Sequence, residues 1–333
     1  MTYPRYQQIQ VEQTPYYHLV SRCVRRSFLC GFDKVTGQSY EHRKDWVEKR
    51  LIYLTKVFSI GVMAYAVMSN HTHLVVYIDK QKCDELTDID VIQKWHMVSK
   101  GNEQSREFAR TGLYPKDESE RIHLNDYIYI IKDRLSDVSW FMKLLNEYIA
   151  RRANKEDECT GHFWEGRFKS QPLLDSAAVL SCMAYVDLNP LRAGITTEPF
   201  VAPFTSLNRR LLAEQNNMQP RFLIPFAHRT TKDTGIHLKL SFTDYTKLIN
   251  DTANRDLKKV PRDLDKVSSQ VISDVGLHED GWFKLTTSFE SLFPTAVGKA
   301  EKLKQYMKAT ERDRVRGESH SYSVYQQSDF KPH

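Results

Sequence analysis

Residues 60–78, IGVMAYAVMSNHTHLVVYI, decide the fold. They contain two apolar runs, 60–68 and 71–78, that are rich in the β-branched and aromatic residues typical of strands. Ser69 and Asn70 stand between the runs, and two short polar residues in such a position indicate a β-hairpin. We therefore predict two neighbouring antiparallel strands here.

Further elements are predicted on both sides of this hairpin. Hydrophobic periodicity and strand-forming composition indicate, in chain order, a strand over 16–24, a helix over 40–58, a helix over 139–154, a short strand over 167–174 and a helix over 176–188. The last helix should end where Asn189-Pro190 follows it. The order matches the split βαββαβ plan. We predict an α+β fold: a ferredoxin-like antiparallel sheet of five strands or near-strands, backed by helices, with His71 and His73 on a middle strand.

Two changes in composition suggest how the chain is divided. Residues 81–138 are charged and show little periodicity, and we interpret them as a helical insertion. After Phe204 the sequence becomes more polar and basic, with helix-like patches. We therefore predict a first domain over 1–204, which carries the insertion at about 81–138, and a mostly helical, basic C-terminal region over 205–333.

The overall composition excludes several classes of protein. With 41 % hydrophobic and 27 % charged residues, the 333-residue chain can bury a core and is neither disordered nor fibrous. No apolar run approaches the roughly 20 residues of a membrane span, and residues 1–10 lack the apolar region of a secretory signal. The five cysteines form no CxxC pair and are odd in number, which indicates a reducing compartment. We expect a soluble cytoplasmic protein.

The motif His71-Thr72-His73 is the sharpest local signal. Side chains alternate along a strand, so the two imidazoles should share one face and could form half of a divalent metal site. Histidine pairs of this kind also occur on sheet surfaces without a metal, and both interpretations remain open at this point.

A second signal lies on the helix predicted before Asn189-Pro190. Tyr185 and Asn189 are four residues apart and should share one helix face, while an apolar stripe lies roughly opposite and can pack on the sheet. Tyr185 is then free for chemistry, although a hydrogen-bonded structural pair is an equally good interpretation of these two residues alone.

Taken together, three motifs resemble a known family. The histidine pair after Ser-Asn, the run GHFWEGRFKS over 161–170 and the run YVDLNPLRAG over 185–194 are similar to the HUH single-tyrosine transposases. More narrowly, they resemble the insertion-sequence 200-like branch that includes the REP-associated tyrosine transposases. The resemblance covers about residues 10–206. Two features depart from the family pattern: Thr72 replaces a usually bulky hydrophobic residue, and the insertion is longer than a compact enzyme of this family needs.

The resemblance implies a metal-dependent endonuclease and strand transferase that acts on single-stranded DNA, with hairpin or palindromic DNA as its partner. Matched residue by residue, it implies Tyr185 as the nucleophile that forms a 5′-phosphotyrosine, and His71, His73 and Asn189 as ligands of Mg²⁺ or Mn²⁺. The covalent intermediate conserves the energy of the phosphodiester, so no nucleotide cofactor is expected. A homodimer is one possible assembly.

Three alternatives to this interpretation stay open. Tyr148, in the run LNEYIARRAN with Arg151 and Arg152, is a competing nucleophile, although it has no polar amide or carboxylate four residues on. The protein could instead be a non-catalytic, domesticated regulator that binds hairpin DNA. It could also be a metal-dependent phosphodiesterase that uses water.

Basic residues on both sides of the predicted site suggest how DNA is held. The net charge is +6, which suits a polyanionic partner but is shared by many proteins without one. We expect a phosphate-tracking groove, with Trp164 stacking on unpaired bases, formed by Arg22, Arg25, Arg26, Arg167 and Lys169. The ordinary alternatives are solvated charge for the cations and a small core plug for the tryptophan.

Overall fold

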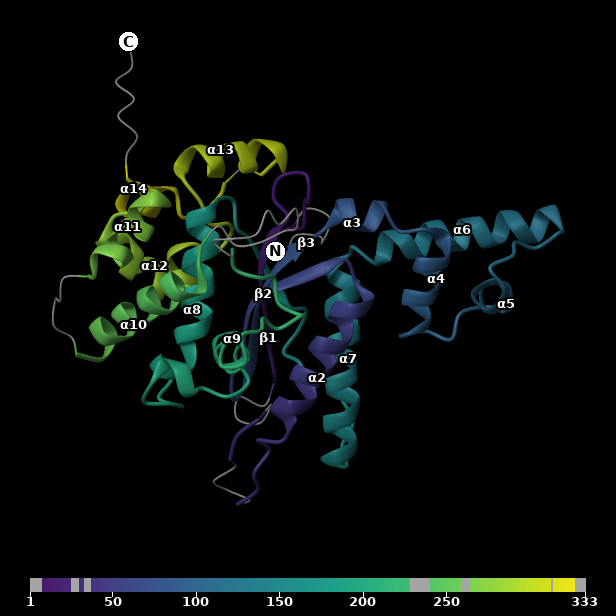
Figure 1. Cartoon of the computed structure of the whole chain (residues 1–333), viewed down its shortest axis with the longest axis horizontal. Helices are drawn as coiled ribbons and strands as arrows, with labels where there is room; N and C mark the ends of the chain where they lie inside the picture. The colour runs from purple at the N-terminus through teal and green to yellow at the C-terminus, as the bar shows by residue number, and fades with distance from the viewer. Residues whose placement is uncertain are drawn as a thin grey trace, which may run out of the picture.

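The computed structural model describes residues 8–24, 30–32, 37–227, 240–258, 264–312 and 314–326. Within them the predicted α+β fold is confirmed: an antiparallel sheet lies at the centre of the molecule with helices around it (Figure 1). The sheet has four strands in the order β2-β3-β1-β4, where the strands are β1 (Tyr16–Arg22), β2 (Ile60–Val67), β3 (His71–Ile78) and β4 (Lys169–Pro172). The expected count of five was wrong, because the described chain offers four segments that pair in this sheet.

The connectivity follows the split βαβ plan. Strands β1 and β2 are both antiparallel to β3, so they run parallel to each other with β3 between them, and α2 (Arg43–Val57) connects them. The predicted hairpin joins β2 to β3, where the Met68 amide donates to the carbonyl of His71 at 2.9 Å. His71 and His73 therefore lie on a middle strand, as predicted.

Different helices cover the two faces of the sheet. On one face, α2 packs with α7 (Val138–Glu156) over residues that include Leu19, Leu74 and Val76. On the other face, α8 (Ser176–Arg192) packs over Ala64 and Val75, which alternate with the first set along their strands. In Figure 1 the sheet stands between α2 and α7 on one side and α8 with the C-terminal helices on the other.

Helix α8 is longer than the sequence suggests. The predicted stop at Asn189-Pro190 was wrong, because the helix continues to Arg192 with Pro190 inside it. The turn around the proline is closed by other donors: the Ala193 amide donates to Asn189 at 2.9 Å, and the Ile195 amide donates to Pro190 at 2.9 Å. Asn189 is thus held in regular helix, one turn after Tyr185.

The region between β3 and α7 is helical, as expected of residues 81–138. It contains α3 (Lys80–Asp84), α4 (Asp88–His96), α5 (Glu103–Thr111) and α6 (Glu118–Arg134). These helices begin at side-chain caps, including a capping box at Thr87 and another at Asn102. In Figure 1, α4, α5 and α6 extend away from the sheet beyond α7 and α3.

The C-terminal region is mostly helical, as predicted. Its described helices are α9 (Ser206–Glu214), α10 (Phe242–Lys258), α11 (Lys266–Asp274), α12 (Glu279–Leu292), α13 (Ala300–Ala309) and α14 (Glu318–Val324), preceded by the short 3-10 helix η1 (Pro199–Val201). One hydrophobic cluster contains residues from both sides of position 204, among them Met183, Trp282 and Phe289. The boundary at 204/205 stays a prediction. Among the described helices, none combines the length and hydropathy of a membrane span.

Candidate active site

Three imidazoles gather on the face of the sheet that α8 covers. Val20 of β1 pairs with His73 of β3, and Arg22 pairs with His71. Because side chains alternate along each strand, His18 lies on the same face as both predicted histidines. The rings of His71 and His73 are 4.7 Å apart at an angle of 80°. Thr72 is buried on the opposite face and points away from the imidazoles, as its place in the strand requires.

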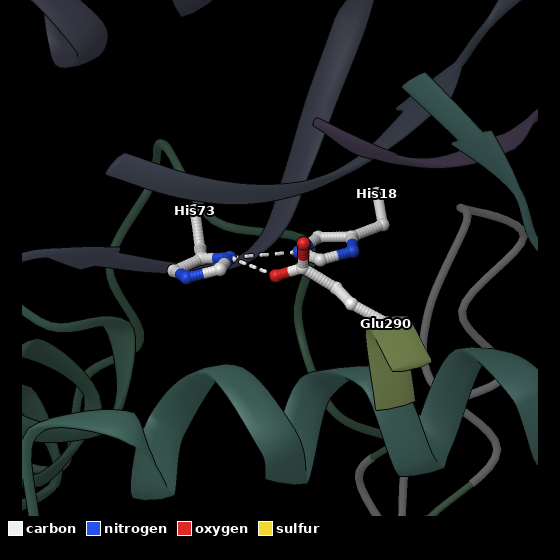
Figure 2. A group of neighbouring side chains, drawn as sticks. All are labelled: His18, His73 and Glu290. Carbon is white, nitrogen blue, oxygen red and sulfur yellow. Dashed lines mark hydrogen bonds and ion pairs between the residues drawn. The ribbon is translucent and has the colours of Figure 1, made fainter. Parts of the chain in front are cut away.

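One group of side chains is close enough to hold a metal ion. Figure 2 shows His18 and His73 reaching from the sheet toward Glu290, which comes from α12. One ligand atom from each residue lies within 4.8 Å of the others. His18 Nε2 and His73 Nδ1 are 2.9 Å apart, and Glu290 Oε1 lies 4.0 Å from His73 Nδ1. Two imidazoles and a carboxylate form a donor set that suits a divalent transition metal.

A chain of hydrogen bonds links His18 and His73 to Gln171 and Asn189 and favours one tautomer of each of these two rings. The amide of Gln171 donates to the carbonyl of Phe293, so its Oε1 accepts from His18 Nδ1 at 3.1 Å. His18 Nε2 then accepts from His73 Nδ1. The lone pair of His73 is left on Nε2, where Asn189 Nδ2 donates at 3.2 Å. In this tautomer the free lone pair of His73 is on Nε2, so an ion could bind there only if the Asn189 amide turned its oxygen inward, with His18 as the partner that orients the ring.

Burial keeps these imidazoles neutral. Desolvation lowers the pKa of His71 to about 4, and the positive charge of Arg22 acts in the same direction. Desolvation also lowers the pKa of His18 and holds that of His73 well below its ordinary value. At neutral pH each ring is therefore neutral and has one unprotonated nitrogen, which is the form of imidazole that binds a metal.

Tyr185 and Asn189 reach this cluster from α8. The Tyr185 hydroxyl donates to Glu290 Oε1 at 3.2 Å, and its ring meets His73 edge-on with the centroids 5.7 Å apart. On its other side the ring stacks on Phe289, with the centroids 5.6 Å apart. Burial, and then the negative charge of Glu290, raise the pKa of Tyr185 well above its ordinary value. The phenol is therefore protonated at neutral pH, and its proton faces a carboxylate.

The structure brings His73, Tyr185 and Asn189 into one cluster and adds three residues to it: His18, Gln171 and Glu290. The ring of His71 meets that of His73, but among the described residues the group close enough to hold an ion contains His18 and does not contain His71. His18 lies in a strand recognised from the sequence, but its position beside His73 depends on a register between strands that the sequence does not state. Glu290 is 105 residues from Tyr185 in the chain and carries no local signal. The predicted roles of Tyr185, His71, His73 and Asn189 stay predictions.

The predicted DNA-binding residues lie in different settings. Arg22 is exposed opposite His71, and Lys169 is exposed opposite Val20, so both share the face of the imidazoles. Arg167 is exposed in the preceding loop. The indole of Trp164 donates to the carbonyl of Asn146 at 2.9 Å, and the half-buried ring packs against Phe163 and the hydrophobic cluster beneath α7. Arg25 and Arg26 lie outside the described residues.

The competing tyrosine lies on the other side of the sheet. Tyr148 belongs to α7, which packs on the face opposite α8. Its hydroxyl accepts from Arg152 at 2.9 Å, and the guanidinium of Arg50 lies 5.0 Å from its ring centroid. Among the described residues, the imidazole and carboxylate group contains none from α7. Tyr148 is therefore surrounded by cations rather than by metal ligands.

Comparison with known proteins gives a partial likeness to a solved structure. No protein-family model and no curated protein matches the chain. Among solved structures, it is similar to a REP-associated tyrosine transposase bound to a REP hairpin. The two chains are 12 % identical, with a TM-score of 0.38, and the alignment covers 72 % of this chain and 99 % of the other. A likeness of this size fixes neither the chemistry nor the substrate of this chain.

Proposed function

We propose that the protein is a metal-dependent endonuclease and strand transferase for single-stranded DNA, with Tyr185 as its nucleophile. One observation carries the proposal: the Tyr185 hydroxyl donates to Glu290 at 3.2 Å, and Glu290 stands beside an imidazole pair able to bind a metal. A nucleophile, a proton acceptor and a metal-binding group are thus supplied by the sheet, α8 and α12 together.

The residues present fit a divalent ion. Neutral buried imidazoles with a carboxylate or an amide oxygen suit Mn²⁺ better than Mg²⁺, which prefers oxygen ligands and water. His73 belongs to both available donor sets: its Nε2 faces Asn189, and its Nδ1 faces His18 and Glu290. A bound ion would polarise the scissile phosphate and stabilise the charge that develops on the departing 3′-oxygen. The hydrogen-bond chain leaves the His73 lone pair on Nε2, and an ion bound on that side would need the Asn189 amide to turn its oxygen toward it.

Tyr185 Oη forms a bond to phosphorus while the bond from phosphorus to the 3′-oxygen breaks. The phenolic proton passes to Glu290, which already accepts that hydrogen bond, and the 3′-oxygen leaves as a hydroxyl after taking a proton from solvent. The products are a 5′-phosphotyrosine and a free 3′-hydroxyl. A 3′-hydroxyl from another strand can reverse the step, so strands are rejoined without a nucleotide cofactor.

A covalent-adduct assay tests this proposal. The full chain is incubated with hairpin-bearing single-stranded DNA and Mn²⁺, and the adduct is detected by denaturing electrophoresis. Tyr185→Phe should abolish the adduct, while Tyr148→Phe, a matched change on the other side of the sheet, should leave it intact. An adduct that persists in Tyr185→Phe and disappears in Tyr148→Phe would assign the chemistry to Tyr148.

The raised pKa of Tyr185 supports a second candidate, a metal-dependent phosphodiesterase that uses water. A phenol that holds its proton tightly is a weak nucleophile, and a metal-bound hydroxide needs no phenolate. The same variant separates the two functions. Cleavage without an adduct in the native chain, retained in Tyr185→Phe, would establish the water mechanism.

A further inference from the structure

A second polar surface lies between α2 and α7, on the face of the sheet opposite the candidate active site. Figure 1 shows the two helices side by side. The hollow between them measures about 540 Å³ and opens to solvent. Nothing in the chemistry proposed for Tyr185 uses this surface, which we call the α2–α7 groove.

The α2–α7 groove is strongly basic. Its lining includes Arg50, Arg151, Arg152 and Lys155, against a single acidic residue, Glu147. Glu147 already forms an ion pair with Arg151 on the same helix. The groove therefore carries an excess of positive charge that its own lining does not neutralise. Arg151 and Arg152, which α7 contributes to it, are exposed to solvent.

Aromatic rings hold two of these cations in place. The guanidinium of Arg152 lies 4.0 Å from the ring centroid of Trp46 and donates to the Tyr148 hydroxyl at 2.9 Å. The guanidinium of Arg50 lies between two tyrosines, 5.3 Å from the ring of Tyr53 and 5.0 Å from that of Tyr148. Stacking on a ring fixes the plane of a guanidinium group. Two of its N–H groups can then donate to two oxygens of one phosphate.

The groove is linked to the active-site side of the sheet through the loop before β4. Near the end of α7, the Asn154 amide donates to the carbonyl of Gly161 at 3.0 Å. Further along the same loop, Trp164 bonds to Asn146 of α7 and forms a β-bridge with Cys23, just beyond β1. The loop therefore runs from the basic end of α7 to the end of β1 that carries Arg22.

We propose that the α2–α7 groove binds the sugar–phosphate backbone of the same DNA whose strand enters the active site. This inference rests on the proposed function, because the site supplies the reason for DNA to be present. Repeated phosphates spaced along a flexible backbone match a row of cations with an exposed aromatic ring among them. The DNA passes along the loop before β4 and extends the contact from one face of the sheet to the other.

The salt dependence of DNA binding tests the proposal. The double variant Arg151→Gln/Lys155→Gln removes two exposed charges of the groove and leaves the stacked arginines in place. The matched control, Lys302→Gln/Lys308→Gln, removes two exposed charges from α13. Binding of a fluorescent hairpin-bearing strand is measured by anisotropy over a range of salt, and circular dichroism checks the fold of each variant.

The groove variant should lower the slope of log affinity against log salt by about 1 to 2 units, while the control leaves the slope unchanged. Equal slopes for the groove variant and the control would overturn the proposal. Displacement of the DNA by polyglutamate, added at the same concentration of negative charge, would also overturn the proposal. The groove would then be a site for an acidic protein.

These outcomes separate the groove from the proposed function. If the groove variant lowers the slope but no chain forms an adduct, the groove binds DNA and the function assigned to Tyr185 fails. If Tyr185→Phe abolishes the adduct while the slope does not change in the groove variant, the function stands and the groove proposal fails.

Discussion

Tyr185 and Tyr148 lie on helices that cover opposite faces of one sheet, and their hydroxyl groups have opposite partners. Tyr185 donates to the carboxylate of Glu290, whereas Tyr148 accepts from the guanidinium of Arg152. Phosphoryl transfer needs a proton acceptor and charge neutralisation at the phosphate, and among the two tyrosines Tyr185 has metal-binding groups beside it.

The two faces also differ in the kind of ionisable group they carry and in how those groups are packed. On the α8 face, desolvation holds three imidazoles neutral, and neutral imidazoles bind metals. On the α7 face, the guanidinium groups of Arg50 and Arg152 rest on aromatic rings. One face is thus suited to a metal ion and the other to phosphate.

The largest effect is expected from His73→Gln. His73 belongs to both donor sets, so its loss should weaken Mn²⁺ binding by more than about 100-fold, beyond the loss typical of an outer-shell partner. Isothermal titration calorimetry of the full chain measures it. His42→Gln is the matched control, because His42 belongs to the other layer, where it pairs with Glu156. Equal affinity in His73→Gln and the native chain would remove the metal site from this face.

A second pair of variants asks on which side of His73 the ion binds. If it binds at Nε2, where the hydrogen-bond chain leaves the lone pair, His71→Gln should remove a ligand and abolish most Mn²⁺ binding. His18→Gln should then weaken binding by about 10- to 100-fold, the usual effect of losing a residue that orients a ligand. The reverse order, with His18→Gln the more damaging, would place the ion at Nδ1 beside Glu290. Calorimetric titration of both variants under the same conditions decides between the two sides.

The sequence predicted the parts of the fold and site that depend on local pattern. The Ser69-Asn70 connection and the alternation of β3 were enough to place the histidine pair on one face of a middle strand. Helix spacing likewise placed Asn189 one turn after Tyr185. His18 and Glu290 could not be found this way, because each joins the cluster through tertiary packing: one through the β1–β3 register, the other through the contact of α12 with α8. The end of α8 was missed because the turn beyond Pro190 is stabilised by amides further along the chain.

The neutral imidazoles make stability depend on pH in a definite direction. The pKa of His71 is about 4 in the folded chain, below the ordinary value of 6.5, so the unfolded chain takes up the proton first as pH falls. Stability that is present above pH 6.5 is therefore lost between pH 6.5 and pH 4. Between pH 7 and pH 5 we expect the free energy of unfolding of the metal-free protein to fall by about 2 kcal/mol from this residue. His18 and His73 act in the same direction.

Urea unfolding at pH 7 and pH 5 in the presence of a chelator measures this loss. His71→Gln cannot take up the proton, so its stability should change less between the two pH values, by roughly the same 2 kcal/mol. An identical pH dependence in the variant and the native chain would mean that the His71 ring is not held neutral by burial.

The smallest effect is expected on the α7 face, where charge rests on the surface. Arg152→Gln removes the stack on Trp46 and the hydrogen bond to Tyr148, and should lower the free energy of unfolding by about 0.5–1 kcal/mol. Arg151→Gln is the matched control: its ion pair with Glu147 is exposed, so its loss should cost less than about 0.5 kcal/mol. Urea unfolding at neutral pH measures both. A loss above about 2 kcal/mol in Arg152→Gln would make that side chain a structural support of α7. Losses of unfolding free energy as small as those expected would mean that the fold does not depend on these arginines. They could then bind a phosphate, in contrast to the buried histidines on the opposite face of the sheet.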